Sequence, residues 1–109
     1  MNALLHAVVS DPYWEVRQHA IYSLRRLHPL DGPSGDEILN AIHSSLKDSD
    51  SDVRSSAAFA LGDIGDTQHL AALDSMAATD HALDAEGNEV SASAKLSAEN
   101  IRKRLGLLN

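Results

Sequence analysis

The stretch that decides the fold is VRSSAAFALGDIGD at residues 53–66, because it repeats the pattern VRQHAIYSLRRL of residues 16–27. A shift of 37 residues superimposes the Val, the Arg, the first Ala, the Leu and a final Leu or Ile. After another 37 residues, a third copy at residues 90–101 keeps the Val, the Ala and the Ile, while Ser91 replaces the Arg. Repetition at a period of about 20–50 residues is the signature of stacked repeat proteins. The sequence therefore predicts three copies of one structural unit.

The apolar residues of each copy follow helical spacing. At about 100° per residue they fall on one side of a helix, which predicts a buried face that contains Val16, Val53 and Val90. A further amphipathic segment precedes the repeated stretch in the first two copies. The residues predicted to face inward in these two segments are Leu5, Val9, Ile42 and Leu46. Each copy is therefore predicted to be a helix pair, and the chain to be an all-α superhelix, or solenoid, of about three pairs.

A chain of 109 residues has the size of one domain. We expect a single repeat domain over residues 1–109, with the three pairs at approximately 1–28, 34–65 and 67–107. In the third pair, a long loop at roughly residues 79–89 is expected between the two helices.

The amino-acid composition argues against several classes of function. Hydrophobic residues make up 43% of the chain and aromatic residues only 4%, a balance that suits closely packed helices. The net charge of −7 opposes binding to nucleic acid, which depends on clustered Lys and Arg. The chain has no Cys, which excludes disulfides, thiolate metal sites and Cys nucleophiles. No apolar run approaches the ~20 residues that span a bilayer, and the N-terminus lacks a signal-peptide pattern, so we expect a cytoplasmic protein without a membrane partner.

Two motifs resemble the HEAT-repeat family, and within it the short phycobilisome-lyase type of repeat. They are DPYWEVR at residues 11–17 and the stretch at residues 53–66, and the resemblance is strong over residues 3–78. It implies a ladder between repeats, made by the Asp of each turn and the Arg of each second helix. The ladder residues in this chain would be Asp11, Arg17, Asp48 and Arg54. Ser91 breaks the ladder, so the third copy is expected to be a terminal cap.

The resemblance also implies that the second helices of the pairs line a concave face. Stacked repeats use such extended faces for binding. The positions opposite the buried side lie near Gln18, Tyr22 and Arg25. Tyr22, Phe59 and Leu96 are separated by 37 residues each, which predicts a row of three apolar side chains on this face. Because exposed apolar surface and aromatic anchors are typical of interaction sites, we expect this row to bind a partner.

Two of these interpretations have a structural alternative. The apolar row can instead pack into grooves between the repeats, in which case Phe59→Ala would cost ~3–5 kcal/mol rather than less than ~1.5 kcal/mol. Trp14 lies in the turn of the first pair, where it either shields the edge of the first repeat or anchors a partner at one rim of the concave face.

Metal, cofactor and catalytic sites are not predicted. His6 and His43 are 37 residues apart, but neighbouring helices lie ~8–10 Å apart, which is too far for these side chains to share an ion readily. The run from Asp48 to Asp52 resembles the start of a calcium loop, yet the Gly and Glu that such a loop requires are missing. The acidic loop at 80–89 is interpreted as solvated rather than as a cation site. Asp66 is interpreted as a helix cap rather than as a catalytic acid.

We therefore expect a non-catalytic interaction or scaffold module that binds a protein or peptide on its concave face. The alternative is a helical accessory segment of a larger enzyme, as found in chromophore lyases and at the C-terminal end of some aminopeptidases. A nucleic-acid module is disfavoured by the charge. If the chain is a fragment, the edge near Leu5 and Val9 should drive homodimer formation through an exposed end of the solenoid.

Overall fold

The computed structural model describes residues 2–27 and 33–107 of the chain. Within these residues the α-helices are α1 (Asn2–Ser10), α2 (Trp14–Leu27), α3 (Pro33–Ser44), α4 (Ser51–Ile64), α5 (Leu70–Thr79) and α6 (Val90–Arg104). A 3-10 turn, η1 (Ser45–Lys47), extends α3, and another, η2 (Thr67–His69), precedes α5. The described residues contain no strand, only one isolated bridge between Leu83 and Glu89. The all-α repeat fold predicted from the sequence is confirmed.

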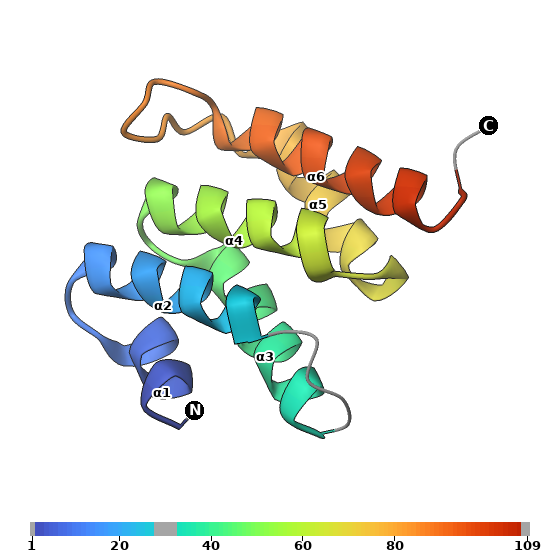
Figure 1. Cartoon of the computed structure of the whole chain (residues 1–109). Coiled ribbons are helices and arrows are strands. Elements are labelled where there is room, and N and C mark those ends of the chain that lie inside the picture. The colour runs from blue at the N-terminus through green and yellow to red at the C-terminus, as the bar shows by residue number, and fades with distance from the viewer. Residues whose placement is uncertain (1, 28–32, 108–109) are drawn as a thin grey trace.

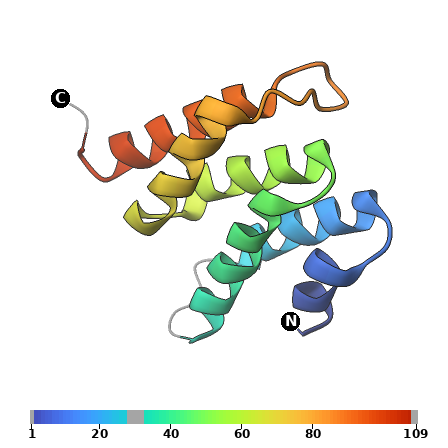
Figure 2. The ribbon, with the colours of Figure 1, turned by 180° about the vertical axis from the view of Figure 1, so that it is seen from behind.

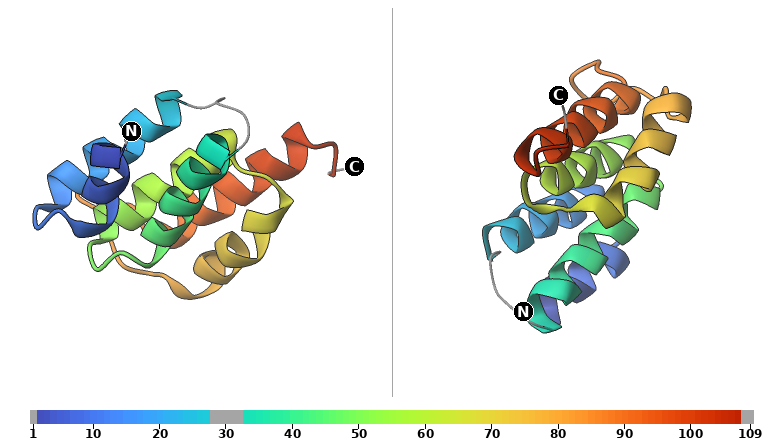
Figure 3. Two further views of the ribbon diagram at one scale, coloured as in Figure 1. Left: turned by 90° about the horizontal axis from the view of Figure 1, so that it is seen from below. Right: turned by 90° about the vertical axis from the view of Figure 1, so that its right-hand side faces the viewer.

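The six helices form two layers. α2, α4 and α6, the second helices of the pairs, lie side by side in the view of Figure 1. α1, α3 and α5, the first helices, lie behind them and face the viewer in Figure 2. The views from below and from the side show the same two layers (Figure 3). We call the outer surface formed by α2, α4 and α6 the second-helix face.

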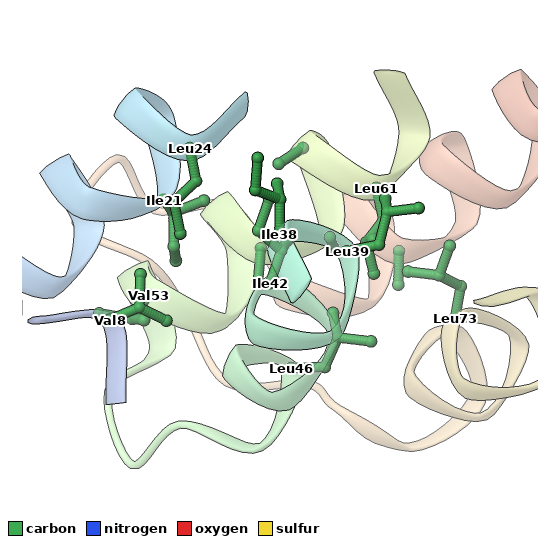
Figure 4. Close-up of a cluster of buried hydrophobic side chains, with 14 of the residues drawn as sticks. Val8, Ile21, Leu24, Ile38, Leu39, Ile42, Leu46, Val53, Leu61 and Leu73 are labelled. Atoms are coloured by element: carbon green, nitrogen blue, oxygen red, sulfur yellow. The ribbon is translucent and has the colours of Figure 1, made fainter. Parts of the chain in front are cut away.

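Aliphatic side chains from both layers form one core. Leu24 of α2 and Leu61 of α4, which the repeat predicts to be equivalent, are both fully buried. They are drawn with Ile42 of α3 and other core residues in Figure 4. Gly62 brings α4 close to α6, because a Cβ atom at this position would lie 2.9 Å from the Cα atom of Ser97. Gly62 thus permits the close spacing of α4 and α6.

The first pair departs from the predicted burial at its outer edge. Val53 and Val90 are fully buried, whereas Val16 is 41% exposed. Val53 belongs to a core that also contains Val8 of the preceding pair (Figure 4). No helix pair occupies the corresponding place beside Val16 in the part of the chain that the structure describes. The prediction that Val16 is buried is therefore wrong, because burial at this position needs a preceding pair.

The prediction that Val9 faces the core is also wrong. Val9 is 59% exposed, and its neighbour Val8 enters the core instead. Leu46, the equivalent of Val9 in the second pair, is buried. Leu46 lies in the 3-10 turn η1, while α1 stays α-helical as far as Ser10. Because a 3-10 turn rotates the chain further per residue than an α-helix, equivalent positions point in different directions.

No described helix combines the length and the apolar character that crossing a membrane requires.

Candidate functional site

Arg17 of α2 joins the first pair to the second. Its Nε and Nη2 atoms each donate a hydrogen bond of 2.9 Å to the carboxylate of Asp48, and its Nη1 atom donates to the backbone oxygen of Asp11 at 2.8 Å. The side chains of Arg17 and Asp48 are only 12% and 10% exposed. The bond to Asp48 raises the pKa of Arg17 above its ordinary value. A bidentate contact constrains both distance and orientation, so this pair fixes how the first two helix pairs stack.

Arg54 makes the same kind of contacts one pair further along. Its Nε and Nη2 atoms donate to the carboxylate of Asp80 at 2.8 and 3.3 Å, and its Nη1 atom donates to the backbone oxygen of Asp48 at 2.9 Å. Asp80 directly follows α5, and its side chain is 17% exposed. The interpretation of Asp80 as part of a solvated loop is therefore wrong. The ladder reaches the third pair, where Ser91 stands in place of a further Arg.

Three of the direct polar contacts between successive second helices join residues that are 38 positions apart. They join Gln18 Nε2 to Ser56 Oγ at 2.8 Å, Arg25 Nη1 to Asp63 Oδ2 at 2.8 Å, and Ser55 Oγ to Ser93 Oγ at 2.9 Å. A constant separation is expected when neighbouring helices run in register with a 37-residue repeat. The second-helix face is thus a regular surface on which the positions of side chains follow from the repeat.

Tyr22, Phe59 and Leu96 all lie on the second-helix face, with different exposure. Phe59 is 52% exposed and Leu96 is 55% exposed. Tyr22 is half-buried, and its hydroxyl lies 3.1 Å from the hydroxyl of Ser56. Arg25 lies between the two rings, with its guanidinium carbon 6.0 Å from the centre of Tyr22 and 5.8 Å from the centre of Phe59. This geometry allows cation–π attraction, so Tyr22 and Phe59 are held in place by their polar neighbours.

The other two residues assigned to this surface differ in their surroundings. Gln18 is half-buried and shares the hydroxyl of Ser56 with Tyr22. Trp14, at the start of α2, is half-buried and packs against the hydrophobic core. The structure therefore groups Gln18 with the apolar row, while the contacts of Trp14 are those of a residue that covers the edge of the core.

Two hollows adjoin Phe59 on the second-helix face. The acidic hollow, of about 320 Å³, is lined by Gln18, Tyr22, Asp52, Ser55, Ser56, Phe59, Asp84, Glu86, Asn88 and Ser93. The basic hollow, of about 500 Å³, is lined by Arg25, Phe59, Gly62, Asp63, Asn100, Lys103 and Arg104. Phe59 lines both, so its ring stands between two recesses of different charge. These hollows could not be predicted from the sequence, because each combines residues of α2, α4 and α6, and the acidic hollow also includes residues of the 80–89 loop.

His69 is a buried polar residue in η2 that lines neither hollow. The side chain of Asp66 accepts a hydrogen bond from the backbone N–H of Gln68, and His69 Nδ1 accepts one from the backbone N–H of Asp66 at 3.0 Å. The predicted cap at Asp66 is confirmed. Burial lowers the pKa of His69, against the opposing charge of Asp66. The ring of His43 lies 5.3 Å from that of His69, whereas His6 is exposed on α1.

The carboxylates of the acidic segments form hydrogen bonds with the backbone. The Asp50 carboxylate caps the start of α4, and that of Asp52 accepts the backbone N–H of Ala85. The carboxylate of Asp84 accepts the backbone N–H groups of Glu86 and Asn88. Across the described ranges, no group of three or more His, Asp or Glu side chains is placed to hold a metal ion. These carboxylates therefore shape the turn before α4 and the 80–89 loop.

The stacked helix pairs and the Asp–Arg ladder define the chain as an α-helical repeat protein. The family model for HEAT repeats matches residues 1–92, and the chain belongs to this family. No curated protein and no solved structure matches the chain. HEAT repeats are generally protein-interaction scaffolds and are typically not enzymes.

Proposed function

We propose that this chain is a non-catalytic interaction module that binds a segment of a protein or a peptide on its second-helix face. Phe59 and Leu96 would supply the apolar contact, with Tyr22 and Arg25 beside them. The observation that carries this proposal is the exposure of Phe59, at 52%, in a chain with only 4% aromatic residues. An aromatic ring between two hollows is the kind of anchor around which interfaces form.

The surroundings of Phe59 also support a binding role. Arg25, which lies over the ring, is itself held by Asp63 at 2.8 Å. The hydroxyl of Ser56, one turn before Phe59, accepts a hydrogen bond from Gln18 and contacts the hydroxyl of Tyr22. Because these polar side chains are already fixed by one another, a partner would find an ordered surface and lose little free energy in ordering it.

The same proposal covers the type of repeat, the larger assembly and the location of the chain. The motifs at residues 11–17 and 53–66 support the phycobilisome-lyase type of HEAT repeat, and with it the alternative of an accessory segment of a larger enzyme. The exposed edge of the first pair, with Tyr13 at 68%, Val9 and Val16, favours that alternative or a homodimer, because either would cover apolar surface. Light scattering of the chain and of Val16→Lys tests the homodimer, which the substitution should dissociate.

We propose a cytoplasmic location for the module.

A random-peptide selection on the intact chain tests the binding proposal. Selected peptides would be titrated into the wild type, into the double variant Phe59→Ser with Leu96→Ser, and into Tyr13→Ser. Tyr13 is a matched control, because it is an exposed aromatic residue that lines neither hollow. Circular dichroism of each variant would establish that the helices are retained.

The proposal expects peptides that bind the wild type and Tyr13→Ser alike and lose at least about tenfold in affinity on the double variant, which corresponds to ~1.4 kcal/mol. Two results would contradict it. One is a selection without any binding peptide, and the other is a set of peptides that bind the folded double variant as well as the wild type.

A further inference from the structure

The two hollows beside Phe59 carry opposite charges, and they lie near opposite ends of α4. Asp52 lies at the first turn of α4 and lines the acidic hollow, while Asp63 lies at the last turn and lines the basic hollow. At a rise of ~1.5 Å per residue, the eleven steps along the helix from Asp52 to Asp63 span ~16 Å. Phe59 lines both hollows and separates them. The second-helix face is therefore polarised along one direction, although the net charge of the whole chain is −7.

The acidic hollow is lined by three carboxylates and by no Lys or Arg. Asp52 and Asp84 already accept backbone N–H groups of the 80–89 loop, which keeps them in place. Glu86 is exposed at the rim of the hollow. The remaining lone pairs of these groups favour a cationic side chain, since Arg and Lys donate to carboxylates.

The basic hollow carries three cationic side chains and one carboxylate. Arg25 pairs with Asp63. Arg104 donates to the backbone oxygens of Gly62 and Gly65, both at 2.9 Å, so its charge is fixed at the C-terminal end of α4. Lys103 is exposed, and no salt bridge joins it to another of the described residues. With one of three cations balanced by Asp63, the hollow favours a negatively charged group.

We infer that the partner segment is bipolar. It is an extended peptide with a central apolar or aromatic side chain on Phe59, Lys or Arg on the side of the acidic hollow, and Asp or Glu on the side of the basic hollow. At ~3.3 Å per residue, about five extended residues cover the ~16 Å between the ends. This inference rests on the proposed function and adds the chemistry of the segment that the face binds.

The acidic net charge alone gives a different expectation. A chain with a net charge of −7 would favour uniformly basic peptides through long-range attraction. The polarised face instead favours a peptide with both signs, because a cation placed beside Lys103 and Arg104 is repelled at close range. Complementary charge distributions set specificity and orientation in this way.

Synthetic peptides with a central Phe separate these expectations. The bipolar peptides carry two Arg residues on one side of the Phe and two Glu residues on the other, made in both chain directions. One control has the same composition with Arg and Glu alternating, and another has Arg at all four charged positions. Each is titrated into the intact chain, Lys103→Glu, Glu86→Lys, and the double variant Phe59→Ser with Leu96→Ser.

One bipolar peptide should bind the wild type more tightly than either control, and added salt should weaken it. Lys103→Glu and Glu86→Lys should each reduce its affinity about 2–5-fold, as expected for one exposed charge contact. Lys103→Glu should in turn improve binding of the all-Arg peptide. If peptides bind through Phe59 but the alternating or all-Arg control binds as well as the bipolar peptide, the inference is overturned and the proposed function stands. If the designed peptides fail while randomly selected peptides bind through Phe59, the inference is overturned too. If no peptide of any kind depends on Phe59, the proposed function itself fails.

Discussion

The first and second helix pairs carry nearly the same motif, yet equivalent residues in them have different surroundings. Val16 is 41% exposed and Val53 is fully buried. The carboxylate of Asp11 accepts one backbone N–H, that of Tyr13, whereas the carboxylate of Asp48 binds the guanidinium of Arg17 in the pair before it. The motif therefore specifies where a residue sits in its own pair, and the neighbouring pair decides what that residue contributes. In stacked repeats, much of the stability comes from such interfaces.

A large difference is expected between Asp48→Ala and Asp11→Ala. Asp48→Ala leaves the largely buried Arg17 without its counter-ion, and we expect it to reduce the free energy of unfolding by ~3 kcal/mol. Asp11→Ala removes a turn hydrogen bond and should cost ~1 kcal/mol. Urea unfolding of both variants measures the two values. Equal losses would contradict the view that the interface between pairs sets the role of the turn Asp.

Val53→Ala and Val16→Ala test the same comparison in the core. Removal of two buried methyl groups at Val53 should cost ~2 kcal/mol, from lost burial and the cavity that remains. The same change at Val16 should stay within ~0.5 kcal/mol, as at most surface positions. Thermal unfolding followed by circular dichroism would rank them. A loss at Val16 that matches the loss at Val53 would show that Val16 is covered in solution.

A smaller, pH-dependent effect is expected at His69. Because burial lowers the pKa of His69 in the folded chain, the unfolded chain binds more protons as the pH falls below ~6.5. His69 therefore contributes a loss of stability from pH ~6.5 downward, which levels off below its folded pKa. His69→Gln should make the unfolding free energy less dependent on pH in this range. An unchanged slope in His69→Gln would contradict the account of the buried cap.

A small effect on stability is also expected at Phe59. Because half of its surface is exposed, Phe59→Ala should cost less than ~1.5 kcal/mol. Leu61→Ala, two residues further along the same helix, removes a fully buried side chain and should cost ~2–5 kcal/mol. Chemical unfolding of Phe59→Ala and Leu61→Ala would compare the two losses of unfolding free energy. A loss above ~3 kcal/mol at Phe59 would identify it as a packing residue and count against the second-helix face as a binding surface.

Much of the fold could be predicted from the sequence, because the repeat encodes it locally. The spacing of Val53, Ala57 and Leu61 identifies a helix with one buried side, and all three are fully buried. What could not be predicted depends on contacts between pairs. Val16 follows the sequence pattern of a core residue. Only the arrangement of the helices shows that no described helix pair covers it.

The candidate binding site was likewise predictable only in part from the sequence. The 37-residue period places Tyr22, Phe59 and Leu96 on one face, since it carries each second helix onto the next. Asp80 escaped prediction because it lies 32 residues after Asp48 rather than 37, owing to the shorter link before α5 and the longer loop after it. Its position directly after a first helix, like that of Asp48 after η1, is the signal that could have identified it. The acidic hollow also depends on the 80–89 loop, and the basic hollow on Lys103 and Arg104 beyond the repeated stretch, so the repeat alone does not reveal them.

The most direct test of the account is to map a bound peptide on the folded chain by backbone amide chemical shifts. A peptide selected on the wild type would be titrated into isotope-labelled protein. We predict shift changes around Phe59 in α4 and at the facing turns of α2 and α6, with α1, α3 and α5 unaffected. Changes that concentrate on α1, α3 and α5, or at the exposed edge around Val16, would contradict the claim that the second-helix face is the binding surface.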